Sequence, residues 1–121
     1  MNKKSKVEVI SFGFKYGENP PSDLQLDLRN RIKNPQSHLP KGAVGTQQIV
    51  KKTVLGNPQN KKILERYQIR VLSLLKQKNE LTTISFGCRS GIHRSVVFAE
   101  ELAVRLRKLG FEVKVTHQHL K

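Results

Sequence analysis

The stretch from Leu81 to Leu109 constrains the fold of this chain more than any other, because the spacing of its apolar residues changes partway along. Residues 81–87 read LTTISFG, a short run of β-branched and aromatic side chains that predicts a buried strand. From His93 onward the apolar residues recur at helical spacing, which predicts a helix that Gly110 stops. The predicted buried face of this helix consists of Val96, Ala99, Leu102, Ala103, Leu106 and Leu109.

The loop between this strand and this helix, CRSGI at residues 88–92, has the composition of an anion-binding loop. Small residues let an anion approach the unpaired N–H groups of the first helical turn, where the helix dipole is positive. The next three residues add an imidazole, a guanidinium that matches two phosphate oxygens at once, and a hydroxyl. The alternative is an ordinary turn with a solvated arginine. We predict that a phosphate or another oxyanion binds to Arg89, Ser90, Gly91, His93, Arg94 and Ser95.

The rest of the chain predicts three further strands and two further helices. Strands are expected at residues 7–12, 24–28 and 111–116, and helices at 46–55 and 57–78, with Thr46 and Asn57 as N-caps. The order β-β-α-α-β-α-β predicts a single α/β domain over residues 1–121, with a small sheet of about four strands and helices packed on it. We expect residues 1–6 to be flexible. Asp27 and Arg29 emerge together at the end of a strand, where α/β folds place their binding sites.

Length and cysteine content set further bounds. A chain of 121 residues suits one domain with one modest core. It contains no run of about 18 apolar residues, so we expect no transmembrane helix, and residues 7–14 are too short for a secretory signal. The single cysteine cannot form an internal disulfide, which favours a reducing, cytoplasmic location.

The net charge of +14, from 23 basic and 9 acidic residues, favours a polyanionic partner. Nucleic acid is the first candidate, because the chain has no basic amphipathic helix with a bulky aromatic face for a membrane. Adjacent lysine pairs suit contact with a phosphate backbone more than base recognition, and the alternative is a surface that is merely cationic. The predicted RNA-binding residues are Lys33, Lys41, Lys51, Lys52, Lys61, Lys62, Arg105 and Lys108.

Several motifs are spread along the chain: ISFGFKYG at residues 10–17, Asp27-x-Arg29, Asn34-Pro35, GCxxGxHRSV at 87–96 with the AE and LA pairs at 99–103, and His117. Together these motifs resemble the C-terminal domain family of the RNase adaptor protein RapZ. They occur in the family's order, and the resemblance runs from about residue 7 to the end. It implies binding of glucosamine-6-phosphate, help in binding small regulatory RNAs, and homo-oligomerisation.

The resemblance also implies site residues, because Asp27, Gly91, His93 and Arg94 match positions near the family's phosphosugar site. In the full family protein a P-loop ATPase-like domain precedes this one, and no Gly-x-x-x-x-Gly-Lys-Ser/Thr motif occurs in this chain. Three places depart from the family. The loop usually reads Cys-Thr-Gly-Gly and here reads CRSG, the histidine that follows Asn-Pro is glutamine here, and the usual His-Arg-Asp of the tail is His-Gln-His. The identity of the phosphorylated ligand stays open.

A second resemblance is to the Cys-x5-Arg-Ser signature of tyrosine and dual-specificity phosphatases. A Cys88 thiolate at the helix start would attack phosphorus, Arg94 would hold the phosphate oxygens and Ser95 would assist the leaving thiolate. Asp23 or Asp27 would then be the general acid. The residue before the cysteine is glycine, where phosphatases usually have histidine. We therefore favour non-catalytic binding, with a cysteine-dependent phosphatase as the alternative and a purely structural oligomerising module as a third hypothesis.

The histidines give no metal-binding pattern. His38, His117 and His119 with one cysteine do not match a known ligand spacing, so we expect no metal and no cofactor. We expect the His-x-His of the tail to lie in solvent at a frayed end. Phe12, Phe14 and Tyr16 either stack on a base or sugar or anchor the core and loop.

Overall fold

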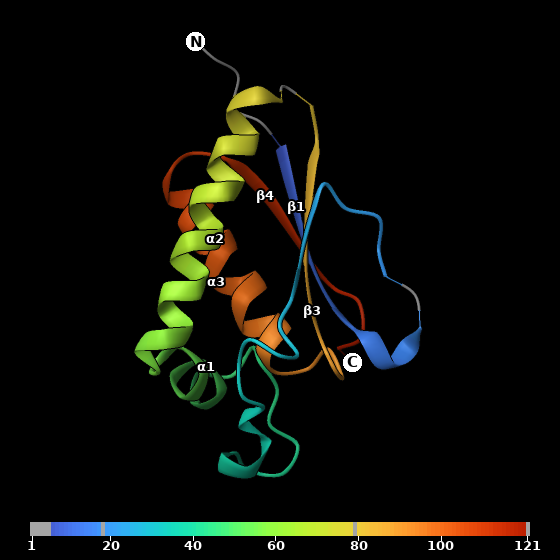
Figure 1. Ribbon diagram of the computed structural model, residues 1–121, viewed down its shortest axis with the longest axis vertical. Coiled ribbons are helices and arrows are strands. Elements are labelled where there is room, and N and C mark those ends of the chain that lie inside the picture. Colours follow the sequence, from blue (N-terminus) through green and yellow to red (C-terminus); the bar gives the residue numbers. More distant parts are fainter. Residues whose placement is uncertain (1–5, 18, 79, 121) are drawn as a thin grey trace.

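The computed structural model of the chain describes residues 6–17, 19–78 and 80–120 (Figure 1). In these residues the fold is a parallel sheet with three α-helices, which confirms the predicted single α/β domain and its element order. The strands are β1 (Lys6–Gly13), β2 (Leu24–Asp27), β3 (Thr82–Cys88) and β4 (Glu112–His117), in the spatial order β2-β3-β1-β4. The helices are α1 (Gln48–Leu55), α2 (Pro58–Gln77) and α3 (Arg94–Lys108), with short 3-10 turns η1 (Phe14–Tyr16) and η2 (Pro35–His38).

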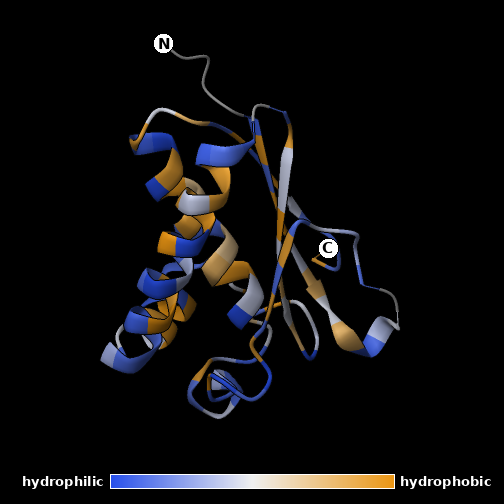
Figure 2. Cartoon of the chain, turned by 45° about the horizontal axis from the view of Figure 1, so that its top comes forward, coloured by the Kyte–Doolittle hydropathy of each residue, from blue (hydrophilic) through white to orange (hydrophobic). Residues whose placement is uncertain are grey.

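The main core lies between the sheet and the helices, which cover one of its faces (Figures 1 and 2). Val9 of β1 is level with Ile84 of β3 on one side and with Val115 of β4 on the other. Phe86 lies beside the rings of Tyr67 and Phe98, at centroid distances of 5.2 and 5.7 Å. Sheet and helices therefore bury one continuous apolar layer, which is the dominant favourable contribution to folding.

The opposite face of the sheet is covered at its carboxyl end by the segment between β1 and β2. Phe14 packs edge-on against Phe12 at 4.8 Å, and Ser22 Oγ is hydrogen-bonded to Ser85 Oγ at 2.6 Å. Phe12 and Ser85 are both fully buried as a result. The carboxyl-terminal halves of the two central strands, β1 and β3, are thus buried on both faces, as is usual in parallel sheets.

The first residues of α1 and α2 show where the local sequence was sufficient to predict the start of a helix and where it was not. α2 begins as predicted, because Asn57 Oδ1 accepts the N–H of Gln59 at 2.9 Å. The prediction of Thr46 as the N-cap of α1 is wrong, since Gln47 occupies that position. The reason is tertiary: the N–H of Gly45 donates to the carbonyl of Ile92 at 2.6 Å, so this part of the chain is docked on the start of α3 and turns helical later.

Two predicted core residues lie at the surface. Leu109 is 54% exposed, because it caps the C-terminus of α3 just before Gly110, which has a φ of 98°. Leu81 is 53% exposed and precedes β3. Lys6 begins β1, and residues 1–5 of the segment expected to be flexible lie outside the described residues. None of the helices in the described part of the chain is long and apolar enough to cross a membrane.

Candidate anion-binding site

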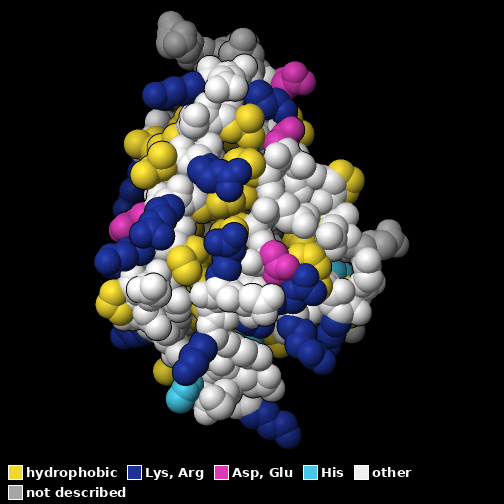
Figure 3. Space-filling view, in the orientation of Figure 1, with side chains coloured by type: hydrophobic (Ala, Val, Ile, Leu, Met, Phe, Trp, Pro, Cys, Tyr) yellow, Lys and Arg dark blue, Asp and Glu magenta, His cyan; other side chains and the backbone are white. Residues whose placement is uncertain are grey.

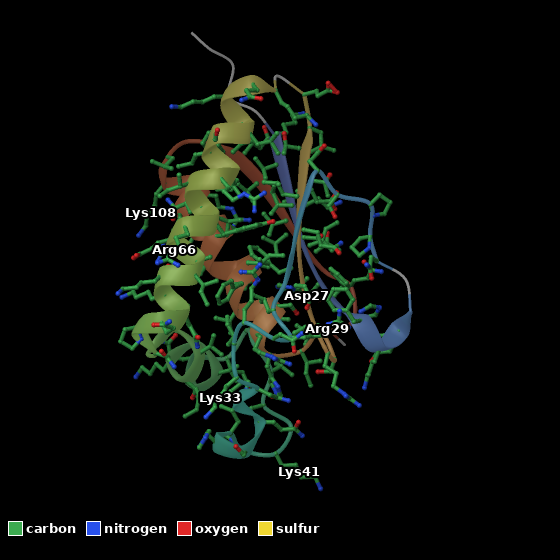
Figure 4. The ribbon with its side chains drawn as sticks, in the orientation of Figure 1. Asp27, Arg29, Lys33, Lys41, Arg66 and Lys108 are labelled. Carbon is green, nitrogen blue, oxygen red and sulfur yellow. The ribbon has the colours of Figure 1, made fainter. Side chains whose placement is uncertain are left out.

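A pocket of about 590 Å³ opens where β2 and β3 end. It is built from η1, from the segment that follows β2 and from the loop between β3 and α3 (Figure 4). Its described lining residues are Phe14, Lys15, Arg29, Asn30, Ile32, Lys33, Asn34, Arg89 and Arg94. Five of these nine side chains are basic and none is acidic, so the pocket suits an anion. Carboxyl ends of parallel strands are the usual place for a ligand site in α/β folds.

Arg29 is held in a fixed position on the pocket wall. Its Nε and Nη2 donate to the two carboxylate oxygens of Asp27 at 3.0 and 2.6 Å, and its guanidinium carbon lies 3.8 Å from the ring centroid of Phe14. The hydrogen bonds from Arg29 lower the pKa of Asp27 below its usual value. The two side chains therefore do emerge together, and Asp27 orients Arg29 from outside the described lining. A side chain at position 87 would collide with the Phe14 ring, which explains the glycine there.

Arg94, the first residue of α3, holds the segment after β2 in place and also lines the pocket. Only 5% exposed, it donates through Nη1 to the carbonyls of Ile32 at 2.9 Å, Arg29 at 3.3 Å and Leu28 at 3.5 Å. These bonds curve the segment after β2 around the guanidinium, which also lines the pocket. Sequence reasoning missed this role, because the carbonyls lie 62 to 66 residues away in the chain. Direct binding of an anion by Arg94 stays a prediction.

The loop between β3 and α3 is packed against the end of β1. A methyl group at Gly13 would lie 2.5 Å from the carbonyl carbon of Ser90, and Gly91 has a φ of 76°. The N–H of Lys15 donates to the carbonyl of Arg89 at 3.1 Å. Ser90 and Gly91 are therefore engaged with β1 and lie outside the described lining of the pocket, whereas Arg89 lines it.

Three other predicted site residues make internal contacts. His93 Nε2 is hydrogen-bonded to the carbonyl of Ala43 at 2.8 Å, which ties the long loop before α1 to the N-cap of α3. Cys88 Sγ donates to Ser95 Oγ at 3.2 Å, with Cys88 1% and Ser95 0% exposed. Cys88 is absent from the described lining residues.

The remaining pocket residues were only partly anticipated. Phe14 was a candidate for stacking on a base or sugar, and Lys33 was predicted to contact RNA. Lys15 and Asn30 were not predicted to bind a ligand. The sequence did contain a signal that these residues belong to a site. The segment with Lys15 and the segment with Asn30 and Lys33 each directly follow a strand that carries a family motif.

The predicted RNA-binding residues are spread over the helical side and the lower end of the molecule (Figures 3 and 4). Two of them are paired: Lys51 Nζ lies 3.2 Å from Glu101, and Arg105 Nε donates to the same carboxylate at 3.1 Å. The others have exposed side chains, namely Lys33, Lys41, Lys52, Lys61, Lys62 and Lys108. Lys33 and Lys41 lie in the loop segments below the sheet, and Lys108 lies on the helical side (Figure 4).

The C-terminal tail is anchored, so the expectation of a solvated His-x-His is wrong. His117 is hydrogen-bonded through Nδ1 to Ser11 Oγ at 2.7 Å and through Nε2 to Glu100 at 2.6 Å. His119 Nδ1 accepts the N–H of Gly13 at 2.8 Å, and its ring stacks on Tyr16 at 3.9 Å. The contacts arise because β4 runs parallel to β1 and delivers the tail to its end. Among the described residues, no group of three or more His, Cys, Asp or Glu side chains is arranged to hold a metal ion.

The fold and the pocket define a small α/β domain with a cationic site at the carboxyl ends of its strands. Residues 5–121 match the RapZ C-terminal domain, and the chain belongs to that family. A nucleotide-binding protein of Streptomyces coelicolor is 35% identical over 95% of this chain and 40% of its own length. A nucleotide-binding protein of Geobacter sulfurreducens is 34% identical over 93% of this chain and 41% of its own length. The chain thus spans about 40% of the length of these relatives.

Proposed function

We propose that this domain is a non-catalytic, regulatory binding module of the cytoplasm. It binds a phosphorylated small molecule, a phosphosugar such as glucosamine-6-phosphate or a similar oxyanion, in the cationic pocket. It binds RNA through its basic surfaces and forms a homo-oligomer. The observation that carries the first part is a pocket with five basic side chains and no acidic one among its described lining residues, at the carboxyl ends of the strands.

The chemistry of the lining fits a phosphosugar. Arg29 is preorganised by Asp27 and Phe14, so little side-chain entropy is lost when an anion binds to it. The amides of Asn30 and Asn34 are suited to sugar hydroxyls, since each offers both a donor and an acceptor. Phe14 supplies an apolar surface in the same pocket. Such a combination of a few polar groups on a partly apolar wall is typical of small-molecule sites.

Binding without catalysis is supported by the environment of the cysteine. A nucleophilic thiolate must reach the phosphorus atom, and Cys88 is 1% exposed beneath the loop. The contact between Cys88 Sγ and Ser95 Oγ is the one feature that also suits a phosphatase. Because the thiol does not face the described pocket, we favour binding.

The relatives' name adds a competing ligand. They are called nucleotide-binding proteins, and the matched part of each is about 40% of its length. A nucleotide also carries phosphate, so ATP and GTP belong in the same binding experiment as the phosphosugar. The absence of a P-loop motif from this sequence favours the phosphosugar.

Calorimetry with glucosamine-6-phosphate tests the proposal. Arg94→Ala should weaken binding by about 1.5–3 kcal/mol, the range for a hydrogen bond to a charged group. Because Arg94 also holds three carbonyls, circular dichroism must confirm that the variant is folded. Lys15→Gln changes an exposed side chain of the pocket and should weaken binding about tenfold. Lys76→Gln removes the same charge from the exposed surface of α2 and should leave the affinity unchanged. Equal affinity of all four proteins would refute the proposed site.

A further inference from the structure

The net positive charge of the pocket is larger than the negative charge of one phosphate group. The five basic side chains of the lining are offset in the described structure by one neighbouring carboxylate, that of Asp27 on Arg29. A phosphate monoester carries a charge of roughly −1.5 to −2 at neutral pH. About two positive charges would therefore stay uncompensated with a monophosphate bound, which favours a ligand with a second anionic group.

The basic side chains are also distributed over two walls. Lys15 of η1 and Arg89 of the loop after β3 lie on one wall, where a backbone hydrogen bond of 3.1 Å joins their residues. Lys33 lies in the segment after β2, which forms the other wall (Figure 4). Arg29, which belongs to the same segment as Lys33, is held by its contact with Phe14, and Arg94 is held by backbone carbonyls of that segment.

The five basic side chains differ in how firmly the fold holds them, which bears on how they would bind an anion. Lys15, Lys33 and Arg89 are exposed, and Arg94 is 5% exposed. The Arg29 side chain is 45% exposed but is stacked on the Phe14 ring and paired with Asp27. Flexible cations at both sides can each close on an anionic group, while the fixed arginines define the space between. The volume of about 590 Å³ lies within the usual range for pockets that hold a complete small molecule.

We propose that the pocket takes a ligand with two separate anionic groups, of the sugar bisphosphate class. One group lies at the wall of Lys15 and Arg89 and the other at the wall of Lys33, with the sugar between them beside Phe14. This inference rests on the proposed function, because it concerns the same site. It adds that the preferred phosphosugar carries its charge at both ends.

Isothermal titration calorimetry at fixed ionic strength tests the inference with three probes: glucosamine 6-phosphate, glucosamine 1,6-bisphosphate and pyrophosphate. The bisphosphate should bind at least tenfold more tightly than the monophosphate. It should also bind more tightly than pyrophosphate, which carries comparable charge without a spacer. Equal affinity for the two sugars would overturn the inference and leave the proposed function standing. Failure of both sugars to bind would overturn both, and pyrophosphate binding as tightly as the bisphosphate would overturn the two-group arrangement.

Two variants locate the second group. Lys33→Gln and Arg89→Gln each remove one exposed cation from opposite walls and should each reduce the preference for the bisphosphate at least threefold. Lys76→Gln, with the same change on the exposed surface of α2, should leave the preference unchanged. A preference that survives in Lys33→Gln and in Arg89→Gln would refute the assignment to these walls.

Discussion

The contact between the end of β1 and the loop before α3 can be tested at one glycine. Gly91 has a φ of 76°, and a methyl group there would lie 2.7 Å from the nitrogen of Gly13 and 2.8 Å from the carbonyl carbon of Phe12. Gly42 has a similar φ of 82° and no atom within 4 Å of such a methyl group. The pair therefore separates backbone strain from steric overlap.

The loss in free energy of unfolding expected for each variant follows from backbone strain and steric overlap. Placing alanine in a left-handed conformation costs about 1 kcal/mol relative to glycine, and this is the expected loss for Gly42→Ala. Gly91→Ala adds overlap with backbone atoms that cannot rotate away, as in an overpacked core, which adds about 1–3 kcal/mol. The expected total loss for Gly91→Ala is about 2–4 kcal/mol, a large part of the stability of a domain of this size.

Urea unfolding followed by circular dichroism measures both variants against the wild type. The slope of the free energy of unfolding against urea concentration should be the same in all three proteins. The midpoint of each unfolding curve then reports the free energy of unfolding directly. Gly91→Ala should lose about 1–3 kcal/mol more than Gly42→Ala. If both variants lose the same free energy, the close packing of the loop on β1 does not contribute to stability and the argument is wrong.

Three further outcomes are expected. Cys88→Ser should retain phosphosugar and RNA binding, because serine fits the same volume and binding needs no thiolate; phosphatase turnover that disappears in this variant would favour the enzyme instead. Burial lowers the pKa of His119 below its usual 6.5, and only the neutral ring accepts the N–H of Gly13. The unfolded chain therefore binds the proton more readily, and the free energy of unfolding should decrease as the pH falls below about 6.5. His119→Gln should flatten this dependence in urea titrations at several pH values, and an identical pH profile for the variant would contradict the role of the ring. Changing Lys61 and Lys62 to Glu should lower RNA affinity and reduce the log–log salt slope by about 1–2 in filter binding of a structured RNA, and a wild-type affinity insensitive to salt would exclude electrostatic binding.

The order of the helices and strands was predictable because each depends on nearby residues. Apolar spacing distinguished β3 from α3, and Asn57 with the proline after it marked the start of α2. Asp27 and Arg29 pair as expected because they are two residues apart at a strand end. The cationic character followed from composition, which no folding can change.

The pocket itself was only partly predictable. The sequence pointed to Arg29, Arg89 and Arg94, and all three line it. It could not assign Lys15 and Lys33 to the same pocket, because only the adjacency of β2, β3 and β1 in the sheet brings their two segments to one site. His93, which was predicted to bind the ligand, is hydrogen-bonded to Ala43 in the loop before α1, and its contact with a ligand stays a prediction.

The helices and strands, the family and the excess of positive charge could all be predicted, because they depend on local spacing and on composition. Which groups face the pocket, and which are hydrogen-bonded within the fold, depends on contacts between residues far apart in the chain. The carbonyls that bind Arg94 lie more than 60 residues from it, and the glycine bonded to His119 lies 106 residues away. Such pairs form because the parallel strands, in the order β2-β3-β1-β4, bring their carboxyl ends to one edge of the sheet. Residues far apart in the chain therefore become neighbours there.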